Sequence, residues 1–202
     1  MNNFNGVAPI YDFLARFVFG NTILKSQVYY LDEIKDGDSV LIIGGGTGRL
    51  LEYVRAKNVA IDYIEPSDKM VERAKKRNFR PSINFYKERF EDFKDSRDYD
   101  IIICPFFLDL FSEATLNETL SKIKGLLSKK GKVIVTDFSS HLDSWYSKIL
   151  LRLMHLFFRW TASLESKMLF DIHKWVLTFG FEECRSQYFY IDLIFSKVYK
   201  IK

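Results

Sequence analysis

A run of small residues, Gly44–Gly48 (GGGTG), directly follows a short, wholly apolar stretch, Val40–Ile43. After it, Arg49–Lys57 has apolar residues at helical spacing. A continuous apolar strand is typical of a parallel sheet that is covered on both faces. A glycine-rich turn between such a strand and a helix lets backbone N–H groups approach a ligand closely. The sequence therefore predicts an α/β fold with a ligand site at the end of its first strand.

The rest of the chain alternates between strand-like and helix-like segments. Further strands are expected at Val59–Ile64, Ile83–Tyr86, Tyr99–Cys104, Lys132–Phe138, Glu183–Tyr190 and Leu193–Ile201. Helices are expected after a cap at Ser67 (with Met70, Val71 and Ala74 facing inward), from Ser112 to Leu127, and over Met168–Phe179 with Gly180 as the C-cap. This order predicts a Rossmann-like, doubly wound, mostly parallel seven-stranded sheet. The last two strands have no helix between them, which implies an antiparallel edge strand.

The length of 202 residues fits one domain, residues 1–202, with two helical additions. Residues 1–31 form an N-terminal helical cap in this interpretation. Its apolar part, Phe4–Leu31, is broken near Gly20 and is expected to pack across the ligand end of the sheet. Residues 139–165 form a helical lid or an interface insertion, with a long helix that begins at Asp143 or Ser144.

The helix of this insertion is unusually apolar. Its polar residues recur at steps of four, three and four and form one narrow stripe: Lys148, Arg152, His155 and Arg159. Four interpretations stay open for the apolar face: burial under the N-terminal segment, the wall of a lipophilic pocket, a homodimer contact, or contact with a membrane surface. The last two would use Leu150–Trp160.

Composition argues against several other classes of protein. The formal net charge is only +4, and no basic stripe is interleaved with aromatic residues, so no nucleic-acid partner is expected. Cys104 and Cys184 lie far apart, with neither metal-ligand spacing nor a disulfide framework, and no metal is expected. The first residues lack the pattern of a signal peptide, and no apolar run reaches the ~18 residues of a membrane span. A cytoplasmic protein is expected.

Two well-known ligand motifs and a purely structural turn are alternative explanations of the glycine loop. The dinucleotide fingerprint G-x-G-x-x-G would need a third glycine where Arg49 stands, and a P-loop would need a lysine after the last glycine. A purely structural turn remains the simplest alternative. Glu65 argues against a purely structural turn, because it lies 17 residues after Gly48 at the end of the second predicted strand. A carboxylate at that position can accept hydrogen bonds from both hydroxyls of a ribose.

The segments around these residues resemble the class I S-adenosylmethionine-dependent methyltransferases. The similar segments are Val40–Glu52, Ile61–Arg77, Asp98–Phe111 and Lys130–Phe138. In addition, Phe4–Phe17 is similar to the opening of the menaquinone/ubiquinone-type methyltransferases. The resemblance implies S-adenosylmethionine as the cofactor and methyl transfer as the reaction.

The resemblance also implies a role for individual residues. It places Gly44, Gly46 and Gly48 against the methionine part of the cofactor, Glu65 on the ribose, Pro66 and Met70 near the adenine, Arg89 and Phe90 at the adenine edge, and Cys104 and Phe106 beside the sulfonium or the adenine. Tyr11 either covers the methionine end or packs within a helix.

Two positions depart from the family pattern. Ile42 replaces an acidic residue that helps to hold the cofactor's amino group in relatives, and Arg89 stands where an aspartate is common. One alternative is therefore a protein that binds S-adenosylmethionine without turnover. Another is an aminopropyltransferase-like enzyme, although only Asp109 would meet a cationic polyamine after the fourth strand.

Methyl transfer asks the protein mainly to align the acceptor and exclude water from it. The acceptor is expected to be small and apolar, quinone-like or lipid-like, because the segments that would enclose it are apolar. Asp109 and His141 are candidate general bases at the ligand end of the sheet, and no catalytic residue is assigned.

Overall fold

The computed structural model describes residues 20–56, 58–95, 97–139 and 171–202. These residues form a seven-stranded sheet in the order β3-β2-β1-β4-β5-β7-β6. The strands are β1 (Ser39–Ile43), β2 (Ala60–Ile64), β3 (Ser82–Tyr86), β4 (Tyr99–Pro105), β5 (Leu127–Phe138), β6 (Phe181–Phe189) and β7 (Ile194–Ile201). The predicted Rossmann-like, mostly parallel sheet is confirmed.

The first five strands pair in parallel, with β1 at the centre between β2 and β4. Four consecutive residues of β1, Val40–Ile43, are fully buried, because both faces of the sheet are covered. Val40 and Ile42 join the core on one face, while Leu41 and Ile43 join the core on the other. Parallel strands point their carboxyl ends toward the same edge, and the loops that follow β1, β2 and β4 therefore lie together there.

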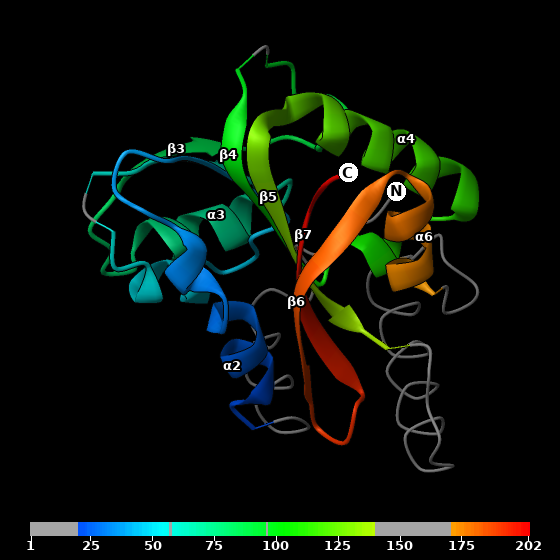
Figure 1. The fold of residues 1–202 in the computed structure, drawn as a ribbon. Helices are drawn as coiled ribbons and strands as arrows, with labels where there is room; N and C mark the ends of the chain where they lie inside the picture. The colour runs from blue at the N-terminus through cyan, green and yellow to red at the C-terminus, as the bar shows by residue number, and fades with distance from the viewer. Residues whose placement is uncertain (1–19, 57, 96, 140–170) are drawn as a thin grey trace.

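Helices cover both faces of this sheet. Figure 1 shows α3 (Asp68–Lys75) on one side and α4 (Glu113–Leu126) with α6 (Ile172–Thr178) on the other. The hydroxyls of Ser67 and Ser112 accept the backbone N–H of Met70 and Thr115, so both predicted N-caps are present. The inward face of α3 is buried as expected.

At one edge of the sheet the strand direction reverses. β7 runs antiparallel to both β5 and β6, which confirms the expected antiparallel pairing at this edge. β7 lies one position in from the edge and β6 is the outermost strand. The two strands form a long hairpin, seen in orange and red in Figure 1.

Two predicted helices differ in the structure. Arg49–Lys57 was expected to be a helix, but only Arg49–Tyr53 is helical, as a 3-10 turn (η3), and Val54 is already extended. Leu50, Leu51 and Val54 are nevertheless buried in the same core as Val40 and Ile42. The second is the helix expected over Met168–Phe179. Within the described residues, it is observed as α6, which begins at Ile172 because the Asp171 side chain caps it by accepting the N–H of Lys174.

A short helix, α2 (Thr22–Val28), precedes the sheet, and a 3-10 turn, η2 (Leu31–Glu33), leads into β1. Gly20 has a positive φ of 58° just before α2, where the sequence predicted a break. Among the described helices, none has the length and apolar character needed to span a membrane. Residues 1–19 and 140–170, with Tyr11, His141 and Leu150–Trp160, lie outside the described residues.

Candidate functional site

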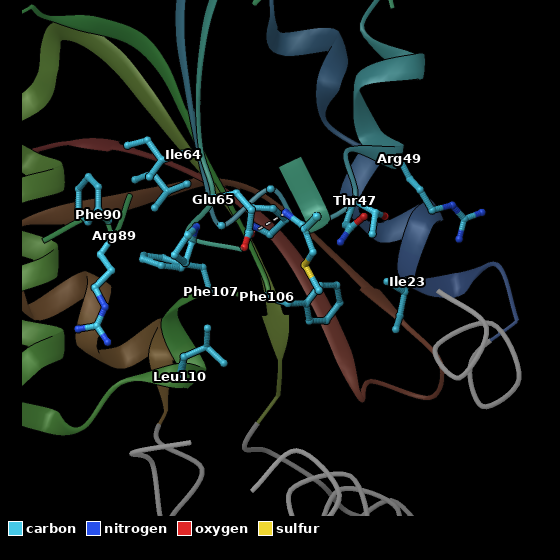
Figure 2. Close-up of a pocket in the computed structure, with 18 of the residues that line it drawn as sticks. Ile23, Thr47, Arg49, Ile64, Glu65, Arg89, Phe90, Phe106, Phe107 and Leu110 are labelled. Atoms are coloured by element: carbon cyan, nitrogen blue, oxygen red, sulfur yellow. Dashed lines mark hydrogen bonds between the residues drawn. The ribbon is translucent and has the colours of Figure 1, made fainter. Parts of the chain in front are cut away.

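A cleft lies at the carboxyl ends of β1, β2 and β4. Its walls come from α2, the glycine loop, the end of β2 and the segments that follow β3 and β4. Of the residues expected at a cofactor, the structure brings these to the cleft: Gly44, Gly46, Glu65, Pro66, Met70, Arg89, Phe90 and Phe106. Figure 2 shows Glu65 in the middle, with Thr47 and Arg49 on one side and Arg89 and Phe90 on the other.

The glycine loop packs closely against Tyr63 on one side and faces the cleft on the other. A Cβ built on Gly45 would lie 2.2 Å from the Tyr63 ring, so this position has no room for a side chain. The Tyr63 hydroxyl donates a hydrogen bond of 2.8 Å to the carbonyl of Gly46. Among the described residues, a Cβ on Gly46 would meet only Met70 Sδ, at 3.9 Å, and Gly46 has a positive φ of 63°. The backbone at Gly46 is thus open to a ligand in the cleft.

Two predicted site residues do not line the cleft. Gly48 faces α3 instead, where a Cβ would come within 2.7 Å of the Ala74 Cβ. Its role is close packing of the loop on that helix. Cys104 is fully buried in the core on the α4 face, because strand alternation places it on the same side as Ile102. Burial raises the pKa of its thiol, so Cys104 is a neutral core residue.

Glu65 is the central polar group of the cleft. Its side chain is only 4% exposed, and its two carboxylate oxygens accept the N–H groups of Gly46 (3.0 Å) and Ser67 (2.9 Å). Burial raises the pKa of the carboxyl to about 7, although the two backbone hydrogen bonds oppose this shift. Each carboxylate oxygen can accept a further hydrogen bond. The arrangement therefore ties the acid at the end of β2 to the glycine loop and leaves it able to bind two hydroxyl groups.

The glycine loop is also held from the side of α3. Arg77 Nε donates to the carbonyl of Thr47 at 2.6 Å, and its guanidinium forms an ion pair with Glu52. The loop is thus fixed by a side chain thirty residues further along the chain.

Aromatic residues after β4 form the apolar wall of the cleft. Phe106 has a positive φ of 53°, which is uncommon for a large side chain, and its N–H donates to the carbonyl of Thr136. This conformation directs the Phe106 ring into the cleft, as Figure 2 shows. Phe107 packs so closely on the glycine loop that a Cβ on Gly44 would lie 2.8 Å from its ring. Leu110 and Phe111 extend the same wall.

Asp109 does not line the cleft but lies beside a second buried acid, Asp137 at the end of β5. Asp137 accepts the N–H groups of Leu108 (3.1 Å), Asp109 (3.3 Å) and Phe138 (2.9 Å) and so fixes the turn after β4. Among the described residues, Asp109 Oδ1 is buried without a hydrogen-bond partner. Burial raises the pKa of Asp109 to about 7, and burial together with the Asp109 carboxyl raises that of Asp137.

The sequence of this region matches a known family. Residues 41–133 match the sequence model of the family described as "Methyltransferase domain". Residues 41–133 are thus similar to a methyltransferase domain. The match covers the described segment from β1 into β5, which holds the glycine loop, Glu65 and the wall after β4. No curated protein sequence matches the chain.

Solved structures of methyltransferases share the fold of this protein over nearly the whole chain. One is DhpI in complex with SAH, at a TM-score of 0.71 and 12% identity, covering 98% of this chain and 93% of that one. Another is the magnesium protoporphyrin IX methyltransferase of Synechocystis with bound SAH, at a TM-score of 0.66 and 16% identity, covering 98% and 96%. A third is the plantazolicin methyltransferase BpumL in complex with SAH, at a TM-score of 0.64 and 16% identity, covering 97% and 89%.

The structure adds cleft residues that the sequence did not single out. They are Ile23, Leu24 and Gln27 of α2, Thr47 and Arg49 at the glycine loop, and Glu91 after β3. A signal for Arg49 was present, since it directly follows the last glycine of the loop. α2 lies within Phe4–Leu31, the segment that was expected to pack across the ligand end of the sheet, although the sequence singled out no individual residue of this helix.

Proposed function

We propose that this protein is an S-adenosylmethionine-dependent methyltransferase that acts on a small, apolar acceptor. The observation that carries the proposal is the buried Glu65 carboxylate, hydrogen-bonded to the glycine loop at Gly46 within the cleft of a methyltransferase domain. Two features of this site favour a nucleoside as the ligand. The Glu65 carboxylate can accept hydrogen bonds from two hydroxyls, and the backbone of Gly46 beside it faces the cleft.

The cleft residues fit S-adenosylmethionine along its length. Glu65 would accept the two ribose hydroxyls, and Pro66 and Met70, with Arg89 and Phe90, would enclose the adenine. Gly44 and Gly46 would lie under the methionine part, because among the described residues a Cβ on Gly46 would meet no atom nearer than Met70 Sδ. The structures of DhpI, the Synechocystis enzyme and BpumL were each solved with SAH, the product of methyl transfer, which supports the same ligand here.

An apolar acceptor is supported by the wall that follows β4. The rings of Phe106 and Phe107 and the side chains of Leu110 and Phe111 face the cleft, and Ile23 of α2 faces it from the other side. Contact with such a wall removes apolar surface from water, which favours a quinone-like or lipid-like molecule over a strongly polar one. Residues 140–170 would complete the acceptor side in this proposal, and Leu150–Trp160 would contribute a pocket wall, a dimer face or a membrane contact.

The bound cofactor supplies a methyl group on a sulfonium, which is its own leaving group. The protein's task is then to align the acceptor with that methyl and to exclude water, and the aromatic wall suits both. An acceptor that carries a proton must lose it. The candidate proton acceptors are Asp109, whose carboxyl lies close to Asp137 behind the wall, and His141.

A radiolabel assay tests this function. The protein is incubated with S-adenosylmethionine that carries a labelled methyl group and with a panel of acceptors that runs from quinols and fatty acids to sugars and polar amines. We expect label in the apolar acceptors, and its loss in Glu65→Ala. Label in polar acceptors alone would refute the apolar substrate class, and no transfer to any acceptor in the presence of bound cofactor would favour a binding protein without turnover.

A further inference from the structure

Resting on the proposed function, we infer that Arg49 binds the carboxylate of the cofactor's methionine part and thereby selects S-adenosylmethionine over its decarboxylated form. The two compounds share the adenosine and the sulfonium and differ in this one carboxylate. Arg49 would thus decide which group the enzyme can transfer, since the decarboxylated form donates an aminopropyl group.

Position is the first support for this role. Arg49 lines the cleft and directly follows the glycine loop, on the side of Glu65 that lies away from Arg89 and Phe90 (Figure 2). If Glu65 holds the ribose and Phe90 lies at the adenine, the methionine part extends past Gly46 toward Thr47 and Arg49. The Arg49 side chain therefore stands at the end of the cleft where the amino-acid group would lie.

Charge is the second support. Arg49 is partly buried, and across the part of the chain that the structure describes its guanidinium makes no hydrogen bond or ion pair. Arg77, which lies near the same loop, is by contrast paired with Glu52 and with the carbonyl of Thr47. An arginine presents a planar set of donors that matches a carboxylate. A cleft arginine whose donors meet no acceptor among the described residues is thus suited to an anionic group.

The third support is what the loop lacks. Ile42, two residues before the first glycine, is fully buried and apolar, so no acid stands there to attract the ligand's ammonium group. Among the described residues, the end of the cleft where the methionine part would lie thus has a cation at Arg49 and no carboxylate at position 42. A ligand with both ammonium and carboxylate would be held here through its carboxylate, and a ligand with the ammonium alone would be repelled by Arg49.

Calorimetric titration of the full chain tests this with four probes. S-adenosylmethionine and S-adenosylhomocysteine carry the carboxylate, decarboxylated S-adenosylmethionine lacks it, and methylthioadenosine lacks the whole amino-acid part. For Arg49→Gln we expect a loss of roughly tenfold in affinity for the first two, as for one charge-assisted pair. Methylthioadenosine should bind unchanged, and the preference against the decarboxylated compound should shrink by a similar factor.

Two further variants control for other effects. Arg55→Gln removes an exposed arginine just beyond the same 3-10 turn and should change no affinity. Arg49→Lys keeps the charge without the planar donor set and should fall between the wild type and Arg49→Gln.

The outcomes separate this inference from the function on which it rests. An equal loss for all four probes, or no loss for any, in a folded Arg49→Gln protein would overturn the role of Arg49 while leaving the methyltransferase proposal intact. If the wild type bound none of the probes, the proposed function would itself fail, and the inference with it.

Discussion

Replacing Glu65 by glutamine should remove a large part of the protein's pH-dependent stability. The carboxyl has a pKa of about 7 in the folded protein, raised from 4.5 by burial. The folded state thus binds the proton more tightly than the unfolded state. The stabilisation from the protonated form is fully present below about pH 4.5 and is lost as the pH rises through 7. Glutamine does not titrate, so Glu65→Gln loses this dependence.

The size of the effect follows from the shift in pKa. It amounts to roughly 2–3 kcal/mol between about pH 5 and pH 8.5 in the free protein, since Glu65 is almost wholly buried. Urea unfolding of the wild type and Glu65→Gln across this range measures it as the change in their stability difference. That difference cancels the contributions of Asp109 and Asp137, which both proteins share.

An exposed glutamate on α3 provides the matched control. Glu72→Gln should leave the pH dependence of the wild type unchanged. Parallel stability curves for the wild type and Glu65→Gln would refute the reasoning, because they would mean that Glu65 titrates in the folded protein as it does in the unfolded chain. The same titration should appear in ligand binding, with S-adenosylhomocysteine binding up to about tenfold more weakly at pH 6 than at pH 8 in the wild type alone.

Other substitutions test the packing and the hydrogen bonds around the cleft. Gly45→Ala should destabilise the protein by about 2 kcal/mol or more in thermal melts, because its Cβ would lie 2.2 Å from Tyr63. Gly125→Ala, in open space on α4, should instead stabilise it by about 0.5–1 kcal/mol in the same assay. Asp137→Ala should cost about 3 kcal/mol or more in urea unfolding, since three backbone N–H groups lose their acceptor, and a loss below 1 kcal/mol would contradict this. Arg77→Met should weaken nucleotide binding several-fold by freeing the glycine loop, with thermal stability falling by only about 1 kcal/mol, and unchanged binding in calorimetry would exclude that positioning role.

Much of the fold was predictable because it rests on local signals. The wholly apolar Val40–Ile43 indicated a strand buried on both faces, and Ser67 and Ser112 indicated helix starts that the structure confirms. The segment Arg49–Lys57 was misjudged as an α-helix. Its buried residues follow helical spacing, but a 3-10 turn with an extended residue after it buries the same positions.

The site was predictable where one motif defined it and less so where tertiary packing decides. Glu65 and Gly46 meet because parallel strands end at one edge, a rule that can be applied to a sequence. The packing of Gly48 on Ala74, by contrast, depends on where α3 lies across the loop. Cys104 turned away from the cleft because of strand alternation, which a count from Ile102 could have predicted.

Calorimetric titration of the wild type and Glu65→Ala with S-adenosylmethionine and S-adenosylhomocysteine tests the central claim most directly. We predict micromolar binding of both nucleotides by the wild type. The Glu65→Ala variant should bind them roughly 10–100-fold more weakly, as expected when two charge-assisted hydrogen bonds to the ribose are lost. Absence of binding to the wild type, or equal binding by the two proteins, would contradict the assignment of this cleft as the cofactor site.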